Sequence, residues 1–457
     1  MDETADIVIC GAGIAGISAA YHLAVKQGVK NVVLVDEREP LTLTSDKSTE
    51  CYRNWWPGPG DTMVRFMNHS IDLLGDLADS SGNYFNLNQR GYIFLTADPV
   101  HARSMQRTAA EIAALGAGEL RVVNKAGDYV PSPGEGYGLA LDGADLLLSP
   151  EMIQAHYPFI NDEAQALLHA RRCGWLSAQQ MGMYMLEQAK AHGARLVTGR
   201  VTAVSLENNR IQAVEVEQNG TKTQIAASAY VIAAGPLVKQ AAAMIGVDLP
   251  VFNELHGKIA FEDTQGVIPR HVPLMIWNDP VRLAWTDEER AELAAFDDTR
   301  WLVEEFPAGV HFRPEGGPGA QTVLAIWTYD VEVKEPTWPI DLPDEYAEII
   351  MRGLVRMVPG LDVYLGKMAR PYIDGGYYCK TQENRPIIGP LPVDGAYIIG
   401  ALSGYGIMAA MAAGELLAAH VTGDALPDYA SDFLLGRYDD PAYRAMLADW
   451  DPTTGQL

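Results

Sequence analysis

The feature that most constrains the fold is a strand, a glycine-rich turn and a helix that follow one another at the start of the chain. The apolar run Ile7-Val8-Ile9-Cys10 is followed at once by Gly11-Ala12-Gly13-Ile14-Ala15-Gly16. From Ile14 to near Gly28 the apolar positions recur at helical spacing. A second apolar run then ends at Asp36, twenty residues beyond Gly16. Two strands, a helix and an acid at this spacing predict a Rossmann-like dinucleotide-binding unit.

Each glycine of this motif has its own physical role in holding a dinucleotide. Gly11 permits the tight turn, Gly13 lets a pyrophosphate approach the backbone, and Gly16 lets the helix lie close to the strand. The helix N-terminus adds unpaired N–H groups and the positive end of its dipole, and Asp36 can accept hydrogen bonds from ribose hydroxyls. The motif occurs once, and other glycine-rich elements lie far downstream, so FAD is favoured over NAD.

Charge argues against several classes of partner. The 457 residues include 34 Lys and Arg against 59 Asp and Glu, a formal net charge of −25. Phosphate backbones and anionic lipid surfaces repel such a chain, so we expect neither a nucleic-acid partner nor a membrane-surface partner. The strongest apolar stretch near the C-terminus, Ile407 to Val421, is broken by Glu415 and is too short to span a bilayer.

The cysteines and the N-terminus indicate the compartment. The four cysteines are scattered, with no CxxC pair and no His/Cys spacing suited to zinc: Cys10, Cys51, Cys173 and Cys379. We therefore expect no disulfide scaffold, no dithiol reductase and no metal site. The N-terminus is acidic and lacks the basic and apolar regions of a signal peptide, which predicts a soluble, cytoplasmic protein.

Other segments combine strands with small residues. Residues 44–49 form a hydroxyl-rich loop, and a strand at 229–232 leads into Ala233-Ala234-Gly235. A strand at 396–399 leads into the glycine-rich turn 400–406 and a helix, which favours a second anion or carbonyl site. Further patterns predict helices at 63–77, 104–115, 146–157, 179–192 and 407–421, and strands at 89–96, 194–197, 201–207, 210–218, 221–226, 257–261, 273–277, 310–313 and 322–328, with turns at Asn208-Asn209 and Asn219-Gly220.

Taken together, these motifs resemble the D-amino-acid oxidase superfamily of flavoproteins, which holds glycine oxidase, sarcosine oxidase and the sarcosine and dimethylglycine dehydrogenases. The resemblance covers most of the chain. The segments that carry it are Gly11 to Gly16 with Asp36, Leu148-Ser149-Pro150-Glu151, Gly174-Trp175-Leu176, Ala233-Ala234-Gly235, Thr381-Gln382-Glu383-Asn384-Arg385-Pro386-Ile387-Ile388-Gly389, and Ser403-Gly404-Tyr405-Gly406.

The resemblance implies a two-domain α/β chain. A Rossmann-like FAD-binding domain of glutathione-reductase type would comprise residues 1–85, 145–250 and 367–457. An antiparallel-sheet substrate domain would comprise residues 86–144 and 251–366.

Four departures from the family pattern bear on the cofactor. Glu383 stands where the family usually has Asp, and Tyr405 stands where a His often lies beside the flavin. The loop 44–49 has no His that could bind FAD covalently, and Cys379 lies nearer to Glu383 than the family's linking cysteine does. We therefore expect noncovalent FAD.

The resemblance also implies which residues contact FAD. They come from the first turn, the hydroxyl-rich loop, the middle strands and the C-terminal glycine turn. They are Gly11, Gly13, Ile14, Ala15, Gly16, Asp36, Glu37, Arg38, Thr44, Ser45, Lys47, Ser48, Thr49, Val201, Ala233, Ala234, Gly235, Gly376, Gly400, Ser403, Gly404, Tyr405, Gly406, Ile407 and Met408.

By the same resemblance the enzyme oxidises a C–N bond of an amine or amino acid, with hydride transfer to flavin N5 and hydrolysis of the imine product. The expected catalytic residues are Tyr405, Tyr378 and Arg313, the last as a carboxylate clamp. Other arginines that could serve as the clamp are Arg53, Arg370 and Arg385. The expected substrate-binding residues are Trp55, Trp56, His256, Arg313, Tyr377 and Tyr378.

Two alternatives stay open at this point. The chain could oxidise a 2-hydroxy acid, in which case His256 or His311 would act as general base. It could instead be a noncatalytic flavoprotein subunit of a hetero-oligomeric oxidase. The sequence also allows either oxygen or another electron acceptor, with Lys47, Lys258 and Lys380 as candidates for oxygen activation, and either a monomer or an oligomer.

Overall fold

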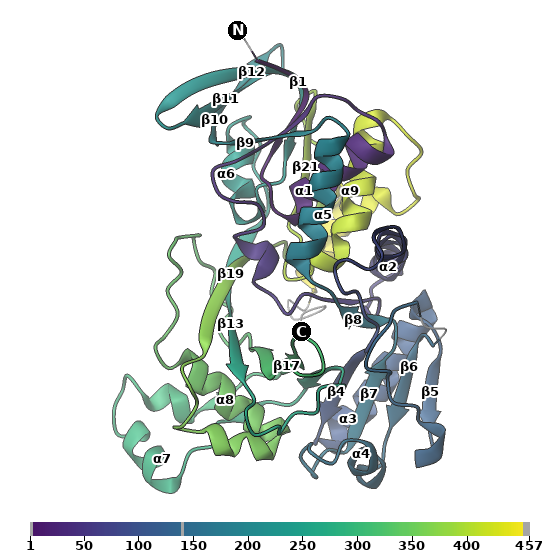
Figure 1. The fold of residues 1–457 in the computed structure, drawn as a ribbon, viewed down its shortest axis with the longest axis vertical. Helices are drawn as coiled ribbons and strands as arrows, with labels where there is room; N and C mark the ends of the chain where they lie inside the picture. The colour runs from purple at the N-terminus through teal and green to yellow at the C-terminus, as the bar shows by residue number, and fades with distance from the viewer. Residues whose placement is uncertain (1–2, 139–140, 451–457) are drawn as a thin grey trace.

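The computed structural model describes residues 3–138 and 141–450, which are built on two large sheets. In Figure 1 an upper sheet, covered by helices α1, α5 and α9, stands above a lower sheet, with α8 toward the left of the view and α3 and α4 toward the right. Strands β13 and β19, which belong to the lower sheet, run up toward the upper part. The α/β fold class is confirmed. Within the described ranges, no helix is long and apolar enough to cross a membrane.

The upper sheet has a parallel centre formed by β21, β12, β1, β2 and β9, in that order. Their bounds are Glu3–Cys10 for β1, Val32–Asp36 for β2, Arg195–Thr198 for β9, Thr221–Ile232 for β12 and Ala396–Gly400 for β21. The antiparallel strands β10 (Arg200–Glu207), β11 (Arg210–Gln218) and β20 (Ile387–Pro390) extend it. The strand, turn and helix predicted at the start of the chain thus lie at the middle of the sheet.

Strand β12 is longer than its sequence pattern indicates. We predict separate strands at 221–226 and 229–232, but one strand runs through both, because β1 pairs with it from Ile225 to Ile232. Its first half also pairs with β11 and its last residues with β21. The turns at Asn208-Asn209 and Asn219-Gly220 are present, with all four residues in the left-handed region.

Helices α1 (Ile14–Tyr21), α5 (Ala178–Ala191) and α9 (Gly406–Thr422) lie together against this sheet. Helix α9 needs small residues because its backbone lies very close to that of α1. The Ser18 hydroxyl donates to the Ala410 carbonyl, and a Cβ at Gly414 would overlap Ser18. The core here is apolar and fully buried, with Ile9, Ile17 and Leu417 among its members.

The lower sheet has nine strands in the order β19-β13-β18-β17-β14-β4-β7-β6-β5. It is mostly antiparallel, as expected, but the β14–β4 and β5–β6 pairs are parallel. The strands are β4 (Tyr92–Thr96), β5 (Leu120–Val123), β6 (Ala144–Leu147), β7 (Ala166–Ala170), β13 (Phe252–Glu262), β14 (Leu274–Trp277), β17 (Val310–Pro314), β18 (Thr322–Ile326) and β19 (Tyr372–Lys380).

The remaining elements surround these sheets. Two short ribbons pair β3 (Cys51–Arg53) with β8 (Cys173–Trp175) and β15 (Val281–Arg282) with β16 (Glu305–Phe306). The other α-helices are α2 (Thr62–Ser81), α3 (Pro99–Ile112), α4 (Pro150–His156), α6 (Val238–Ala243), α7 (Asp287–Ala294), α8 (Tyr346–Met357) and α10 (Pro441–Ala448).

The sheet pairing differs from the expected domain boundaries at three strands. Residues 144–147, 166–170 and 372–380 pair within the lower sheet, although the boundaries give most of them to the FAD-binding part. The predicted helix at 146–157 is also wrong in its first turn. The apolar residues before Ser149 suit a strand and a helix equally. The helix begins only at Pro150, where Ser149 caps it by accepting from the Met152 N–H.

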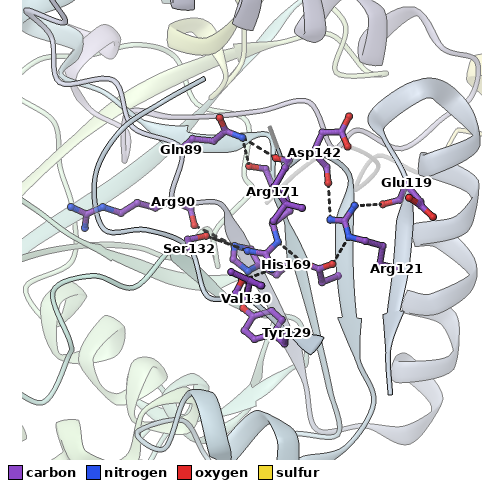
Figure 2. A network of polar contacts seen from close by, with 12 residues as sticks. Gln89, Arg90, Glu119, Arg121, Tyr129, Val130, Ser132, Asp142, His169 and Arg171 are labelled. Carbon is purple, nitrogen blue, oxygen red and sulfur yellow. Dashed lines mark hydrogen bonds and ion pairs between the residues drawn. The ribbon is translucent and has the colours of Figure 1, made fainter. Parts of the chain in front are cut away.

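Figure 2 shows a buried polar network that fastens the loop 129–132 to strand β7. His169 lies at its centre, with Nδ1 2.7 Å from the Tyr129 hydroxyl and Nε2 3.0 Å from Ser132 Oγ and 3.2 Å from the Arg90 carbonyl. Because a carbonyl can only accept, Nε2 carries the proton, so His169 cannot activate Ser132 as a nucleophile. Burial lowers the pKa of His169 well below its ordinary value and keeps it neutral. The network is structural.

Gly91 allows the chain to pass this histidine, and we expect Gly91→Ala to be strongly destabilising. Its φ is +87°, and an added Cβ would overlap His169 Nε2 and lie 2.8 Å from the Ala170 carbonyl oxygen. Strain and overlap together are expected to cost about 3 kcal/mol or more. Thermal unfolding followed by circular dichroism measures the effect. Gly75→Ala, in α2 with open space around it, is the control and should be neutral or slightly stabilising.

Candidate active site

A long cleft lies where the parallel strands of the upper sheet end. It encloses about 1480 Å³, open solvent at its mouth included. The carboxyl ends of β1, β2, β12 and β21 all contribute to it, through Cys10, Asp36, Ala233 and Gly400. Ligands of open α/β sheets bind at this edge.

The three glycines of the first turn have different neighbours. At Gly11, where φ is +115°, an added Cβ would overlap the Ala233 carbonyl. At Gly16 an added Cβ would overlap the Gly11 carbonyl. At Gly13 it would meet only the Ser45 hydroxyl, at 3.2 Å. Gly11 and Gly16 are therefore required by the fold itself, whereas Gly13 lines open space in the cleft. The cleft thus has the backbone approach that a pyrophosphate needs.

Asp36 holds the turn and faces the cleft at once. Its Oδ2 accepts from the Ala12 N–H at 2.7 Å, and its Oδ1 accepts from the Arg38 N–H at 3.0 Å. Each carboxylate oxygen has a second lone pair, so both can still accept from ribose hydroxyls. Ser45 Oγ accepts from the Ile14 N–H at 2.9 Å, which fixes the hydroxyl-rich loop against the start of α1.

A smaller chamber of about 580 Å³ opens from the end of the cleft. The cleft and the chamber share four lining residues, which are Ser48, Tyr378, Ser403 and Gly404. The Tyr378 ring lies flat on the His256 ring, with centroids 4.0 Å apart. A Cβ at Gly404 would come within 2.5 Å of the Tyr378 ring, so this glycine keeps the junction open.

Buried polar groups surround the chamber. Lys380 Nζ donates to Glu254 at 2.9 Å, and His256 Nε2 lies 3.1 Å from the same carboxylate. His256 Nδ1 accepts from the Thr328 hydroxyl at 2.9 Å. Burial lowers the pKa of His256, although Glu254 opposes the shift, and it also lowers the pKa of Lys380. Glu254 and Lys380 thus form a buried ion pair at the chamber wall.

His311 and Arg53 also line the chamber. Burial, helped by the charges of His256 and Arg53, lowers the pKa of His311 to about 4, so its ring is neutral near pH 7. The Arg53 guanidinium lies over the Trp56 ring, 4.6 Å from its centroid, and burial lowers its pKa from the ordinary arginine value. An arginine loses its charge only far above pH 7, so the chamber contains a buried cation.

The structure brings most of the predicted site residues together. Those that line the cleft are Gly11, Gly13, Ile14, Ala15, Asp36, Glu37, Arg38, Thr44, Ser45, Ser48, Val201, Ala233, Ala234, Gly235, Tyr377, Tyr378, Gly400, Ser403, Gly404, Gly406 and Ile407. Those that line the chamber are Ser48, Thr49, Trp56, His256, Tyr378, Ser403, Gly404, Tyr405 and Met408.

Several predicted cofactor contacts, and Trp55 among the predicted substrate contacts, lie behind the lining instead. Gly16 is covered by the Gly11 carbonyl. Lys47 turns to Asp374, with Nζ 2.7 Å from Oδ2, and its stem lies against Gly376. Trp55 is buried in the apolar core. These residues support the walls of the cleft without facing it.

The prediction that Arg313 clamps a substrate carboxylate needs a correction, because its guanidinium is fully buried away from the chamber. It donates to the Thr49 carbonyl and to Glu315, and Glu50 lies 3.5 Å away. Its other face lies over Trp175, 5.2 Å from the ring centroid. With its donors engaged inside the protein, Arg313 joins β17 to the loop after Ser48 and is not placed to clamp a substrate.

Among the other arginines, Arg53 is the one that lines the chamber. Arg370 is exposed, and Arg385 donates to the Pro59 carbonyl at 2.7 Å. Residues that the sequence analysis did not assign also line the two cavities, among them Arg200, Gln240, Met244, Thr328 and Asn384. Arg200 could have been found from its place beside Val201, whereas no local signal marks Gln240 or Met244.

Glu383, the acid of the C-terminal motif, does not line either cavity in the part of the chain that the structure describes. It is fully buried, and its Oε1 accepts from Arg437 at 2.7 Å, from the Tyr438 hydroxyl at 2.7 Å and from the Tyr443 hydroxyl at 2.9 Å. Its longer arm thus holds the segment 435–448 against the sheet.

A glycine-lined cleft at this edge, with a smaller chamber adjoining it, is the arrangement of a dinucleotide-dependent enzyme. The family model described as FAD dependent oxidoreductase (DAO) matches residues 6–420, and the chain belongs to this family. Mitochondrial sarcosine dehydrogenase of Mus musculus is 26% identical over 275 residues, which are 58% of this chain and 26% of that protein. The match thus spans about a quarter of this relative.

Solved structures show the same fold over nearly the whole chain. L-proline dehydrogenase from P. horikoshii has a TM-score of 0.73 at 20% identity, covering 96% of this chain and 99% of that one. Glycine oxidase from Geobacillus kaustophilus has a TM-score of 0.72 at 15% identity, covering 95% and 99%. At these identities the likeness concerns the fold.

Proposed function

We propose that the protein uses FAD to oxidise the C–N bond of a small amine or amino acid to an imine, which water then hydrolyses. The observation that carries the proposal is the chamber itself, which joins the cleft at Ser403 and Gly404 and contains Arg53 beside aromatic walls. Sarcosine dehydrogenase, L-proline dehydrogenase and glycine oxidase, to which the chain is similar, all bear names of C–N oxidising enzymes.

FAD would be held mainly by backbone groups. The turn from Gly11 to Ala15 would hold the pyrophosphate, Asp36 the ribose, and the segment from Ser403 to Ile407 the flavin end. The flavin supplies the acceptor for the two electrons that leave the substrate. Burial raises the pKa of the two thiols that line the cleft, Cys10 to about 11 and Cys379 to about 12, so both stay protonated near pH 7, which supports noncovalent binding.

The residues of the chamber would bind and prepare the substrate. Arg53 would bind a carboxylate through two N–H groups, while Trp56, Tyr378 and Tyr405 would exclude water from the reacting carbon. The amine must be neutral for its lone pair to form the C=N bond. The cations of Arg53 and Lys380 favour that neutral form, because a nearby positive charge lowers the pKa of an amine.

The test is an anaerobic bleaching experiment on the purified holoprotein. The visible absorbance of the oxidised flavin is followed after addition of amines, amino acids and 2-hydroxy acids. We expect rapid bleaching by a carboxylate-bearing amine. A yellow protein that no compound bleaches would contradict the proposal and favour a noncatalytic subunit, and a protein without flavin would refute it.

Oxidation of a 2-hydroxy acid is the second candidate, because a neutral histidine faces the chamber. His311 could take the hydroxyl proton as a general base. The same experiment separates the two candidates, since bleaching by hydroxy acids and not by the matching amines would favour this one.

Further proposals concern the division of the chain, the oxidant and the location. We assign β6, β7 and β19 to the substrate-binding part, because they pair in the lower sheet.

Of the three lysines considered for oxygen activation, Lys380 lines the chamber, whereas Lys258 donates to the Asp46 carbonyl and Lys47 pairs with Asp374. The four free thiols support a cytoplasmic location.

A further inference from the structure

The chamber's polar side chains differ in how much of their hydrogen-bonding capacity the protein already uses. Both ring nitrogens of His256 are engaged, by Glu254 and by Thr328. The Tyr405 hydroxyl donates to the Asn384 carbonyl at 2.7 Å. Lys380 is paired with Glu254. His256 therefore has no ring nitrogen left for a ligand, and Lys380 can offer a ligand only further N–H donors.

His311 is different, because one ring nitrogen is fixed and the other is open. Its Nδ1 lies 2.8 Å from the Gly309 carbonyl, which can only accept, so Nδ1 carries the proton. Nε2 then has a lone pair, and within residues 3–138 and 141–450 the hydrogen bond of this ring is the one at Nδ1. The ring lines the chamber, whose cationic group Arg53 lies near enough to lower the pKa of His311. The Oδ1 of Asn384 also lacks a partner, but it is wholly buried.

We propose that His311 Nε2 accepts a hydrogen bond from the substrate's amine N–H, and that the enzyme therefore selects primary or secondary amines over tertiary ones. The inference rests on the proposed C–N oxidation and deepens it. A tertiary amine has no N–H in its neutral form, so its own lone pair would face that of Nε2. A site built to bond an N–H discriminates strongly against an analogue that lacks it.

The hydrogen bond would also strengthen as the reaction proceeds. The C–H hydrogen would leave with both bonding electrons, as a hydride, to the FAD that the family uses, and the nitrogen lone pair would become the second bond of C=N. A secondary amine R–NH–CHR₂ thus becomes the iminium R–NH⁺=CR₂, whose N–H is a stronger donor than that of the amine. A neutral acceptor at this point stabilises the growing positive charge, whereas a protonated one would oppose it.

Binding of two unreactive acids to the holoprotein tests the inference without turnover. Pyrrole-2-carboxylate and furan-2-carboxylate have the same shape and carboxylate, but only the first has a ring N–H. Titration followed by the flavin's visible spectrum gives both Kd values. We expect wild-type protein to bind the pyrrole at least about 10-fold more tightly than the furan.

Two variants assign this preference to the histidine. In His311→Phe, which keeps a ring and removes the acceptor, the preference is expected to fall to about 1-fold, while His311→Gln, which keeps an acceptor, should restore part of it. His192→Phe, an exposed histidine at the end of α5, is the control and should keep the full preference. FAD content and melting temperature verify that each variant is folded.

Three outcomes would overturn the inference. They are equal binding of the two acids to wild-type protein, a preference that survives in His311→Phe, and no binding of either acid. Failure of the proposed function would give a different result, namely that no amine bleaches the flavin. An enzyme that amines bleach but that binds the two acids equally would keep the function and lose the role of His311.

Discussion

A Gly13→Val protein is expected to fold normally and to lose FAD, with affinity reduced by about 100-fold or more. Gly13 has φ −74° and ψ −178°, an extended conformation that valine adopts without strain. Its added Cβ would meet only the Ser45 hydroxyl, at 3.2 Å, so the fold has room for it. The rest of the side chain would project into the cleft, where we expect the pyrophosphate to approach the backbone.

The measurement is the FAD released by denaturation, together with titration of apoprotein with FAD. Gly16→Ala provides the contrast, because its Cβ would overlap the Gly11 carbonyl and should lower the melting temperature of the apoprotein. Wild-type flavin content in Gly13→Val would show that the dinucleotide does not approach this turn. A Gly13→Val protein that unfolds like Gly16→Ala would instead show that the glycine is structural.

The part of the fold that the sequence predicts best is the part fixed by short-range geometry. The turn between β1 and α1 has the predicted glycines, because a positive φ at Gly11 and a close approach at Gly16 can be met by few other residues. The small-residue helix α9 and the turn before it were predictable for the same reason. The residues that line the cleft follow from these turns, since strand ends of one sheet share one edge.

The substrate side depends on long-range pairing, which a local pattern does not encode. Arg53 and Arg313 were both candidates for the clamp, and the fold distinguishes them because Arg53 lines the chamber and Arg313 does not. Glu315 lies two residues after Arg313 on the same side of the strand end, and Glu50 approaches from a distant loop, so that arginine is paired within the protein. Likewise β6 pairs with β7 across a long connection that contains α4, and the apolar run before Ser149 does not reveal this pairing.

Arg53→Met is expected to lower kcat/KM for a carboxylate-bearing amine by about 100-fold, since two charge-assisted hydrogen bonds to the carboxylate would be lost. Methionine retains an unbranched apolar stem that can lie on Trp56 as the arginine does. The rate of anaerobic bleaching at several substrate concentrations separates KM from the limiting rate. We expect most of the change in KM, because the carboxylate is bound equally in the ground state and the transition state.

The decisive comparison is with an amine that lacks the carboxylate, because only a clamp distinguishes the two substrates. Arg53→Met should leave the slow oxidation of that amine nearly unchanged, and Arg53→Lys should give an intermediate KM, since lysine keeps the charge without the two-pronged geometry. Arg313→Met should behave in the opposite way. It removes the cation beside Glu50 and Glu315, so it should lower the melting temperature and leave KM for both amines alone. An equal loss of activity toward both amines in Arg53→Met would mean that Arg53 supports the chamber wall and that the carboxylate is bound elsewhere.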